Sequence, residues 1–397
     1  MVERVLIRGK MIVDMRRCLK TLSINILILI FMSAGGALVV LLIANRDKNG
    51  LDKITLPKIR KDMELSHGRR DRILGWPTTD FKDMNLTPEG YRRISKIYPQ
   101  TCMIVFGDSF GYGINTSAEK SWVGVLSEKL DCNIHNYSVP GYGLDQIVLR
   151  AEMKMPHYKD KDVILTYIDH DLERTEYSMF SLLWGRYDPL SIKPRFTLEG
   201  DKLSYREMSA ENVFGDVRRY VDKDKAMSSN VLMIVGTKAR KAWDSLMSYG
   251  TVFFKLSSYL TALRVEYMIE PFSKNTLKAI EGYKIGKALL KRHQRNCEEY
   301  RVNCILLRLP TINDIAYPER IRILELDSLA NESGLSYVSS YQIAKCMQST
   351  LLEKQYKGSV ELSMLKHSLE NHYSPEAEMA LGSCVNTGIA ELPHYEQ

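Results

Sequence analysis

The chain has 397 residues, 45% of them hydrophobic, and a formal net charge of +7. This hydrophobic content is sufficient for one large domain or two small ones. The positive charge is not gathered into long basic runs in the globular part of the chain, which argues against a nucleic-acid-binding protein. The excess lies near the amino terminus, which points to a membrane instead.

Residues 21–44 carry no charged side chain and form a stretch long enough to cross a bilayer as one helix. More basic residues precede this stretch than follow it, which favours a cytoplasmic amino terminus. A cleaved signal peptide is the alternative, with its site among the small residues 33–37, but the apolar run continues past them. We therefore predict a cytoplasmic tail at residues 1–20 and a single transmembrane anchor at residues 21–44. The remainder would be exported, on the periplasmic side of a bacterial inner membrane.

Residues 45–100 are polar and basic, and we interpret them as a stem that leads to the folded domain. Six of the seven cysteines follow the predicted anchor, in a compartment where disulfides can form. Their spacing does not pair them, although Cys102 and Cys132 each start a predicted strand, and those strands could be neighbours. Cys297 and Cys304 lack the spacing of metal ligands, and we expect no metal and no organic cofactor.

Strands and helices alternate along residues 101–390, which we predict to be one α/β domain. The predicted strands are short apolar runs at residues 102–107, 133–137, 162–168, 303–309 and 335–338. Amphipathic patterns predict helices at residues 118–130, 144–154, 276–300 and 318–332, and a last helix begins at Pro375 with Ser374 as its cap. The alternation predicts a parallel sheet with helices on both faces. Aromatic and irregular residues at about 175–270 interrupt it, and we interpret them as an insertion.

The triplet Gly107, Asp108 and Ser109 directly follows the first predicted strand. A strand that stops there places one serine hydroxyl at the carboxyl edge of the sheet, where open α/β folds bind their ligands. A serine hydroxyl is a weak nucleophile at neutral pH, and it needs a base and a group that orients the base.

His372 is the best candidate for the base, because it lies in a loop just before the last predicted helix. Glu370, two residues earlier, could bend back to Nδ1 and leave Nε2 facing the serine. Carboxylates near histidines are common, so the spacing alone does not decide this role. The other histidines have plainer interpretations; His135, for example, lies within a predicted strand and is more typical of a core histidine.

Acyl transfer also needs donors for the developing oxyanion. The backbone N–H groups of Ser109 and of Gly141, in the loop after the second strand, are two candidates. A side chain after the third strand would lie at the same edge of the sheet and could supply another. The alternative is that His170, Asp171 and Arg174 form only a surface ion cluster, and spacing alone favours this alternative.

Taken together, these blocks resemble the SGNH/GDSL hydrolase superfamily: the Gly-Asp-Ser triplet, the Val-Pro-Gly-Tyr-Gly loop at residues 139–143, a polar pair after the third strand, and a carboxylate-x-His-x-x-Pro motif near the carboxyl end. The resemblance covers about residues 100–388 without the insertion. It implies a three-layer α/β/α flavodoxin-like fold. It also implies Ser109 as nucleophile and oxyanion donor, Gly141 as second donor and His372 as base. We expect Asp108 and Asp171 to support these residues.

Two positions depart from the family pattern. His170 stands where the family has an asparagine that completes the oxyanion hole, although the expected Asp171 follows it. Glu370 stands where the family has aspartate. An imidazole N–H can donate a hydrogen bond, and a glutamate can orient a histidine, so both departures are compatible with catalysis. A non-catalytic member of the superfamily stays an alternative.

The resemblance implies a serine esterase that removes an acyl group, with acetyl the expected one, through an acyl-serine intermediate. An acylated carbohydrate or another ester would be its substrate, and the lipid bilayer would be contacted through residues 21–44. Three alternatives stay open: an O-acetyltransferase of cell-envelope polysaccharide, a lipid esterase, and a non-catalytic scaffold of an envelope assembly complex. The sequence indicates no nucleic-acid partner, and it does not reveal protein partners. The aromatic insertion could be a lid, a sugar-stacking surface or simply a packed subdomain.

Overall fold

The computed structural model describes residues 50–66, 71–76, 86–222, 281–323, 327–353 and 372–393. The predicted cytoplasmic tail, the predicted anchor at residues 21–44 and the predicted orienting residue Glu370 lie outside these ranges. Within them, every helix is too short or too polar to span a membrane.

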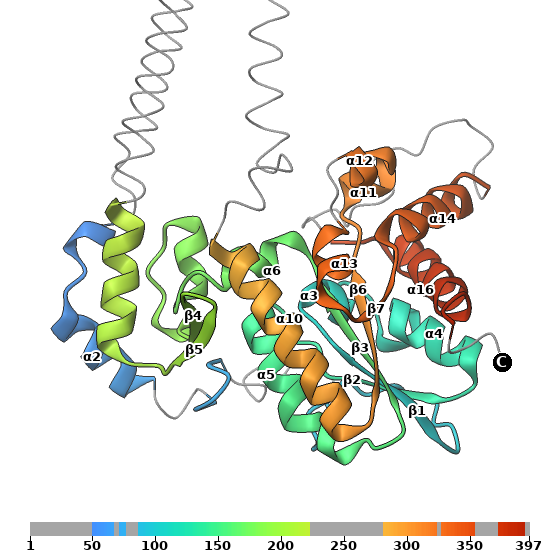
Figure 1. The fold of residues 1–397 in the computed structure, drawn as a ribbon, viewed down its shortest axis with the longest axis horizontal. Helices are drawn as coiled ribbons and strands as arrows, with labels where there is room; N and C mark the ends of the chain where they lie inside the picture. Colours follow the sequence, from blue (N-terminus) through green and yellow to red (C-terminus); the bar gives the residue numbers. More distant parts are fainter. Residues whose placement is uncertain are drawn as a thin grey trace, which may run out of the picture.

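The centre of the fold is a five-stranded sheet in which all neighbouring strands run parallel (Figure 1). Its strands follow the order β2-β1-β3-β6-β7, which is the flavodoxin-like order. The elements are β1 (Thr101–Phe106), β2 (Asn133–Asn136), β3 (Asp162–Tyr167), β6 (Asn303–Arg308) and β7 (Ser336–Val338). All five predicted strands are thus present, and each boundary lies within one residue of its prediction.

Alternate side chains of each strand enter two separate cores. In β1, Ile104 and Phe106 belong to the core on one face of the sheet, while Met103 and Val105 belong to the core on the other. This is the period of two that an extended strand imposes. Because both faces are apolar, both must be covered by helices, as the prediction of a parallel sheet required.

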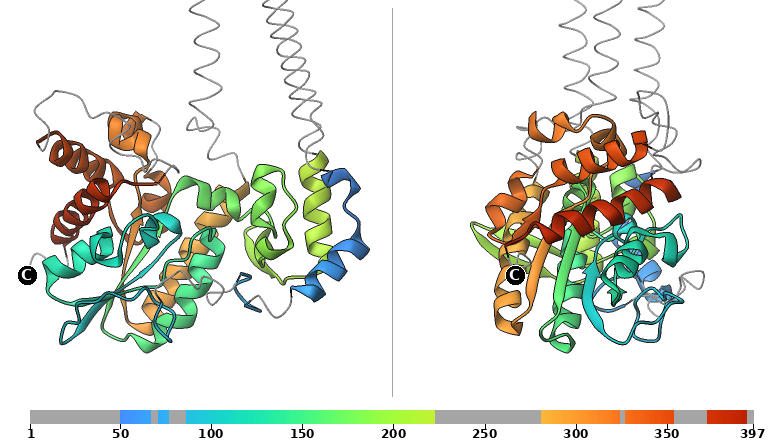
Figure 2. Two further views of the ribbon diagram at one scale, coloured as in Figure 1. Left: turned by 180° about the vertical axis from the view of Figure 1, so that it is seen from behind. Right: turned by 90° about the vertical axis from the view of Figure 1, so that its right-hand side faces the viewer.

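Helices cover both faces of the sheet and give three layers (Figures 1 and 2). One face carries α5 (Leu144–Lys154), α10 (Glu281–Tyr300) and α13 (Ser328–Ser333). The other carries α4 (Trp122–Leu130), α14 (Ser340–Glu353) and α16 (Pro375–Ala390). The predicted start chemistry of the last helix is confirmed, because the Ser374 side chain accepts a hydrogen bond from the Ala377 N–H.

The prediction of one helix over residues 318–332 is wrong. The described residues between β6 and β7 form three short helices, α11 (Ile312–Ala316), α12 (Glu319–Ile323) and α13. Thr311 and Asp314 form a capping box that starts α11. The segment expected at 118–130 is likewise divided into η3 (Ala118–Lys120) and α4, because Ser121 caps the second part. Helix α14 had not been predicted.

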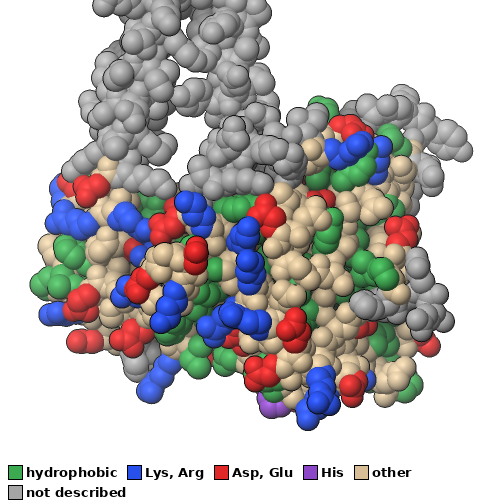
Figure 3. All heavy atoms as spheres, in the orientation of Figure 1, with side chains coloured by type: hydrophobic (Ala, Val, Ile, Leu, Met, Phe, Trp, Pro, Cys, Tyr) green, Lys and Arg blue, Asp and Glu red, His purple; other side chains and the backbone are tan. Residues whose placement is uncertain are grey.

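The described part of the insertion, up to residue 222, forms a small lobe at one end of the molecule (Figures 1 and 2). Basic and acidic side chains are interspersed over the face of the lobe that Figure 3 shows. It contains η5 (Phe180–Trp184), η6 (Pro189–Ser191), the hairpin β4 (Arg195–Glu199) and β5 (Lys202–Arg206), and a helix at residues 210–222. A third apolar cluster fills this lobe, with Met179, Leu182 and Val213 among its buried members.

Part of the segment interpreted as a stem belongs to the same lobe. Residues 50–66 form η1 (Leu51–Lys53) and α2 (Leu56–Leu65), and they bury Leu51, Ile54 and Ile59 in the third cluster. Arg60 also bonds Glu211 at 2.5 Å. Residues 50–66 therefore complete the core of the insertion.

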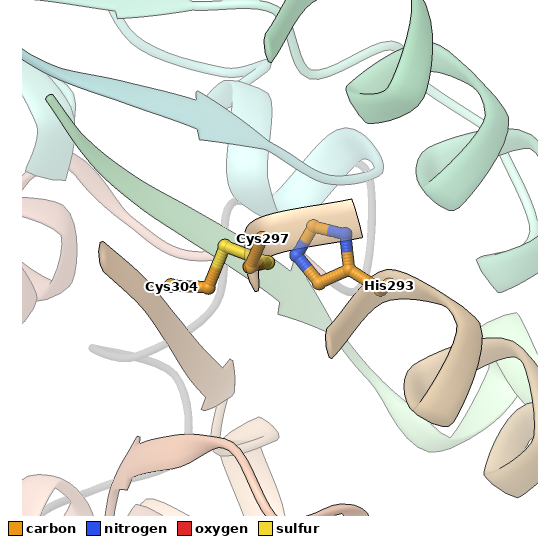
Figure 4. Close-up of side chains that lie close together, drawn as sticks. All are labelled: His293, Cys297 and Cys304. Atoms are coloured by element: carbon orange, nitrogen blue, oxygen red, sulfur yellow. A yellow bond between two sulfur atoms is a disulfide. The ribbon is translucent and has the colours of Figure 1, made fainter. Parts of the chain in front are cut away.

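Three disulfides cross-link the described residues, and they pair Cys102 with Cys132, Cys297 with Cys304, and Cys346 with Cys384. The first is the pair suggested by the two strand starts. His293 lies one helical turn before Cys297 on α10 and points toward that disulfide (Figure 4). Its ligand atoms and the two sulfurs lie within 4.8 Å of one another. Because both sulfurs are bonded in a disulfide, this trio offers no thiolate to a metal ion.

Candidate active site

Ser109 lies in a tight turn at the carboxyl end of β1. It is the first residue of the short helix α3 (Ser109–Tyr112), and only 6% of it is exposed. Asp108 caps this turn, since its Oδ1 accepts from the N–H of Phe110 at 2.9 Å and of Gly111 at 3.4 Å. A Cβ at Gly107 would lie 2.0 Å from Thr166 Oγ1 in β3, so only glycine allows the turn to pack this closely.

The structure brings Ser109 and His372 into hydrogen-bonding distance. Nε2 of His372 lies 2.8 Å from Oγ of Ser109, although 263 residues separate them in the chain. The His372 ring also packs against Phe110, with ring centroids 4.8 Å apart. The next residue, Tyr373, is buried and donates a hydrogen bond to the carbonyl of Pro310. A serine beside an imidazole nitrogen is the geometry that nucleophilic catalysis requires.

The loops that follow β1 and β2 each contain a backbone N–H group that the sequence singled out as an oxyanion donor. Neither the N–H of Ser109 nor that of Gly141 has an acceptor among the described residues. Gly141 follows β2 and has a φ of +83°, a left-handed conformation that favours glycine. Both groups follow strands that end at the same edge of the sheet. Their role as oxyanion donors stays a prediction.

A buried ion network lies beneath the serine turn. Nη1 of Arg174, in α6 (Asp169–Arg174), lies 3.2 Å from Asp108 Oδ2 and also bonds Asp171 Oδ1. The same nitrogen donates to the carbonyl of Tyr142 at 2.9 Å. One guanidinium thus ties together the loops that follow β1, β2 and β3. Burial and the neighbouring Asp108 charge raise the pKa of Asp171 well above its ordinary value.

His170 has a different environment from its neighbour Asp171. Its side chain is 58% exposed, and its Nδ1 lies 2.9 Å from Oε2 of Glu173 on the same helix. This hydrogen bond raises the pKa of His170. The alternative of a surface ion cluster therefore holds only for His170, which pairs with Glu173. Asp171 and Arg174 are buried.

A second buried network was missed by the sequence analysis. Arg308, at the end of β6, donates to both carboxylate oxygens of Asp169 at 2.9 and 2.6 Å, and to Asp314 at 3.0 Å. Asp169 is the first residue of α6, so this ion pair fixes the start of the helix that carries His170, Asp171 and Arg174. A charged residue at the end of an otherwise apolar strand was the only signal in the sequence.

Glu378 is a further buried acid near the site. It lies on α16, is 2% exposed, and its Oε2 accepts from the backbone N–H of Trp122 at 2.9 Å. The Trp122 indole in turn donates to the carbonyl of Phe110 at 3.1 Å. These contacts tie the helix that follows His372 to the serine turn. Burial raises the pKa of Glu378 to about 8.

Only solved structures match this chain in the comparisons with known proteins. No protein-family model matches the chain, and no curated protein matches it. The chain is similar to a solved lipolytic protein of the G-D-S-L family from Desulfitobacterium hafniense, with 12% identity and a TM-score of 0.35 over 73% of this chain and 99% of that one. For TesA the identity is 10% and the TM-score 0.34, over 73% of this chain and 98% of that one.

An acetyl xylan esterase from the rumen bacterium Butyrivibrio proteoclasticus matches with 7% identity and a TM-score of 0.30, over 75% of this chain and 65% of that one. All three TM-scores lie below 0.5. We therefore base the functional proposal on the geometry of the site.

Proposed function

We propose that this chain is a serine esterase of the SGNH/GDSL hydrolase type, which hydrolyses ester-linked acyl groups through an acyl-serine intermediate. The contact between Ser109 Oγ and His372 Nε2, at 2.8 Å, is the observation that carries the proposal. It lies outside the carboxyl ends of β1 and β3, where the strand order reverses and open α/β sheets bind their ligands.

Each step of the reaction has a residue suited to it. Oγ of Ser109 attacks the ester carbonyl while His372 takes its proton, and the N–H groups of Ser109 and Gly141 hold the oxyanion. His372 then gives the proton to the leaving alcohol, and the acyl group stays on Oγ. Water attacks this acyl-serine with His372 as base, which releases the acid and restores the hydroxyl. In this proposal Glu370 orients His372.

Covalent labelling by a fluorophosphonate tests the nucleophile. We expect the full-length chain to be labelled at Ser109, because His372 increases the nucleophilicity of its hydroxyl. Ser109→Ala should remove the label, whereas the exposed Ser95→Ala should keep it. A wild-type chain that is neither labelled nor able to release acetate would favour the non-catalytic scaffold over the enzyme.

Acetyl is the proposed acyl group, and water the proposed acceptor. The distinction from an O-acetyltransferase lies in the fate of the acyl group, because both reactions share the same acyl-serine. Acetate released to water should exceed acetyl transferred to added glycan, measured with the same acetyl donor. The opposite ratio would replace the esterase by the transferase, and faster turnover of long-chain esters would replace acetyl by a lipid acyl group.

We also propose that residues 21–44 anchor the chain in a membrane with the catalytic domain exported. The uncharged stretch and the basic residues before it support this topology. A reporter enzyme that is active only outside the cytoplasm should show activity when it is fused to the carboxyl terminus of the chain. Activity of a reporter that needs the cytoplasm would contradict the proposed orientation.

A further inference from the structure

A row of four aromatic rings leads from the loop after β2 to the surface of the insertion. Tyr142, Trp76, Phe180 and Trp184 follow one another, with ring centroids 5.5, 5.6 and 4.4 Å apart. Exposure rises along the row, from 0% at Tyr142 and 7% at Trp76 to 57% at Trp184. The inner rings belong to the core, whereas the outer end presents an indole to solvent.

The inner part of this row adjoins the proposed oxyanion hole. A Cβ built on Gly141 would lie 3.4 Å from Phe180 and 3.5 Å from Trp76. The Trp76 indole donates to the carbonyl of Pro140 at 3.3 Å. Arg174, which bonds Asp108 beside the nucleophile, also lies over the Phe180 ring at 5.0 Å. The aromatic row and the catalytic residues thus share neighbours.

Several features order the segment that carries the outer rings. Leu182, between Phe180 and Trp184, is fully buried in the core of the insertion. Gly185 ends η5 in a left-handed conformation with a φ of +63°. Lys193, further along the insertion, forms a fully buried ion pair with Asp145 in the first turn of α5. A surface that is ordered in advance loses little entropy when it binds.

The helix that packs beside η5 carries polar side chains. Helix α6 packs against η5, and it presents His170, whose side chain is 58% exposed, and Glu173, whose side chain is 26% exposed. An aromatic face beside hydrogen-bonding side chains suits a sugar ring, which has C–H groups on one face and hydroxyls at its edge. An acyl chain has no hydroxyl groups with which to bond such side chains.

We propose that Trp184 and Phe180 form a subsite for a sugar ring of the substrate, so that the enzyme acts on esters of carbohydrates. The subsite rests on the proposed esterase function, because it positions the sugar that carries the ester beside Ser109. Trp184 supplies the stacking face, and Phe180 connects that face to the loop of Gly141.

Two acetate esters that differ in their alcohol test the subsite with the full-length chain. Glucose pentaacetate carries its acetyl groups on a sugar ring, whereas glycerol triacetate carries them on an open chain. Trp184→Ala should lower kcat/KM for glucose pentaacetate roughly five- to tenfold, the size expected for loss of one aromatic contact, and leave glycerol triacetate within about twofold. Acetate release is measured for both.

Two further variants separate stacking from general hydrophobicity. Trp184→Tyr should retain most of the preference for the sugar ester, while Trp184→Leu should lose it, because only the former keeps an aromatic face. Ile97→Ala is the control, since Ile97 is 84% exposed and precedes β1, at the opposite edge of the sheet.

The outcomes distinguish the subsite from the reaction itself. If the wild type hydrolyses neither ester, the esterase proposal fails and the subsite fails with it. If both esters are hydrolysed but Trp184→Ala slows them equally or not at all, the esterase stands and the sugar subsite is wrong. A Trp184→Leu variant that matches the wild type on glucose pentaacetate would also overturn stacking.

Discussion

The loops that follow β1 and β3 lie at the same edge of the sheet, yet they differ sharply in burial. The β1 loop presents Ser109, which is 6% exposed and already bonded to His372. The β3 loop divides its charged residues, because Asp171 and Arg174 are buried under the serine turn and His170 is 58% exposed. In the proposed esterase, the β1 loop therefore carries the nucleophile, and the buried residues of the β3 loop support it.

Removing the base should have the largest effect. His372→Ala should lower kcat for acetate esters by on the order of 10⁴-fold or more, because Ser109 then has no group to take its proton. The exposed His157→Ala serves as the control and should keep full activity. Steady-state rates with glycerol triacetate give the ratio, and a loss below tenfold would show that His372 is not the base.

Removing the buried cation should have the largest effect on stability. Arg174→Met leaves Asp108 and Asp171 buried without their shared partner, which should cost about 3 to 5 kcal/mol in the free energy of unfolding. Urea unfolding followed by circular dichroism measures the change. Arg186→Met, at an exposed position nearby, should change the stability little. Equal stability of the two variants would refute the supporting role of the β3 loop.

The buried acid on α16 should give a pH dependence. The pKa of Glu378 is about 8 in the fold and near 4.5 when the chain is unfolded, so the folded state holds the proton more tightly. Its contribution to stability is therefore complete below about pH 4.5 and is lost as the pH rises to about 8. Glu378→Gln should flatten this part of the profile of urea midpoint against pH.

Glu376→Gln gives the matched control for this profile, since Glu376 is exposed on the same helix. Its midpoints should fall with pH as steeply as those of the wild type. A Glu378→Gln profile that keeps the wild-type slope would assign the pH dependence to other buried acids, such as Asp171.

The smallest expected effect concerns the exposed histidine of the β3 loop. His170→Ala should lower kcat less than tenfold, because its Nδ1 is bonded to Glu173 and its ring is largely solvated. Loss of an oxyanion donor costs about 100-fold or more, so the size of the effect decides between the two roles. His170→Asn places the family's side chain there and should restore activity only if His170 is a donor.

The sheet and the serine turn could be predicted because their signals are local. The apolar strands show a period of two, and Ser374 caps the helix that begins at Pro375. Gly107 ends the first strand where the chain passes close to Thr166 on a neighbouring strand. The contact between Ser109 and His372 was expected from the family pattern as a whole. The role of Glu370 stays a prediction, since that residue lies outside the described ranges.

The burial of individual charges could not be predicted in the same way. Arg308 is neutralised by Asp169, which is 139 residues away in the chain, and by Asp314, which is 6 residues away. Nothing near Arg308 in the sequence identifies these two partners. His170, Asp171 and Arg174 of α6 looked alike as letters, yet the packing of the helix buries Asp171 and Arg174 and exposes His170. Which face of a short helix is covered depends on the layers around it.

The sequence by itself determined where the five strands and several of the helices lie along the chain, the residues of the serine turn and the candidate base, because these depend on local patterns and on turn chemistry. Only the tertiary structure decided that Arg174 joins three loops, that residues 50–66 complete the core of the insertion, and that a row of aromatic rings runs from Gly141 to Trp184. These features arise from contacts between segments far apart in the chain, whose free energy depends on burial, and burial is a property of the whole fold.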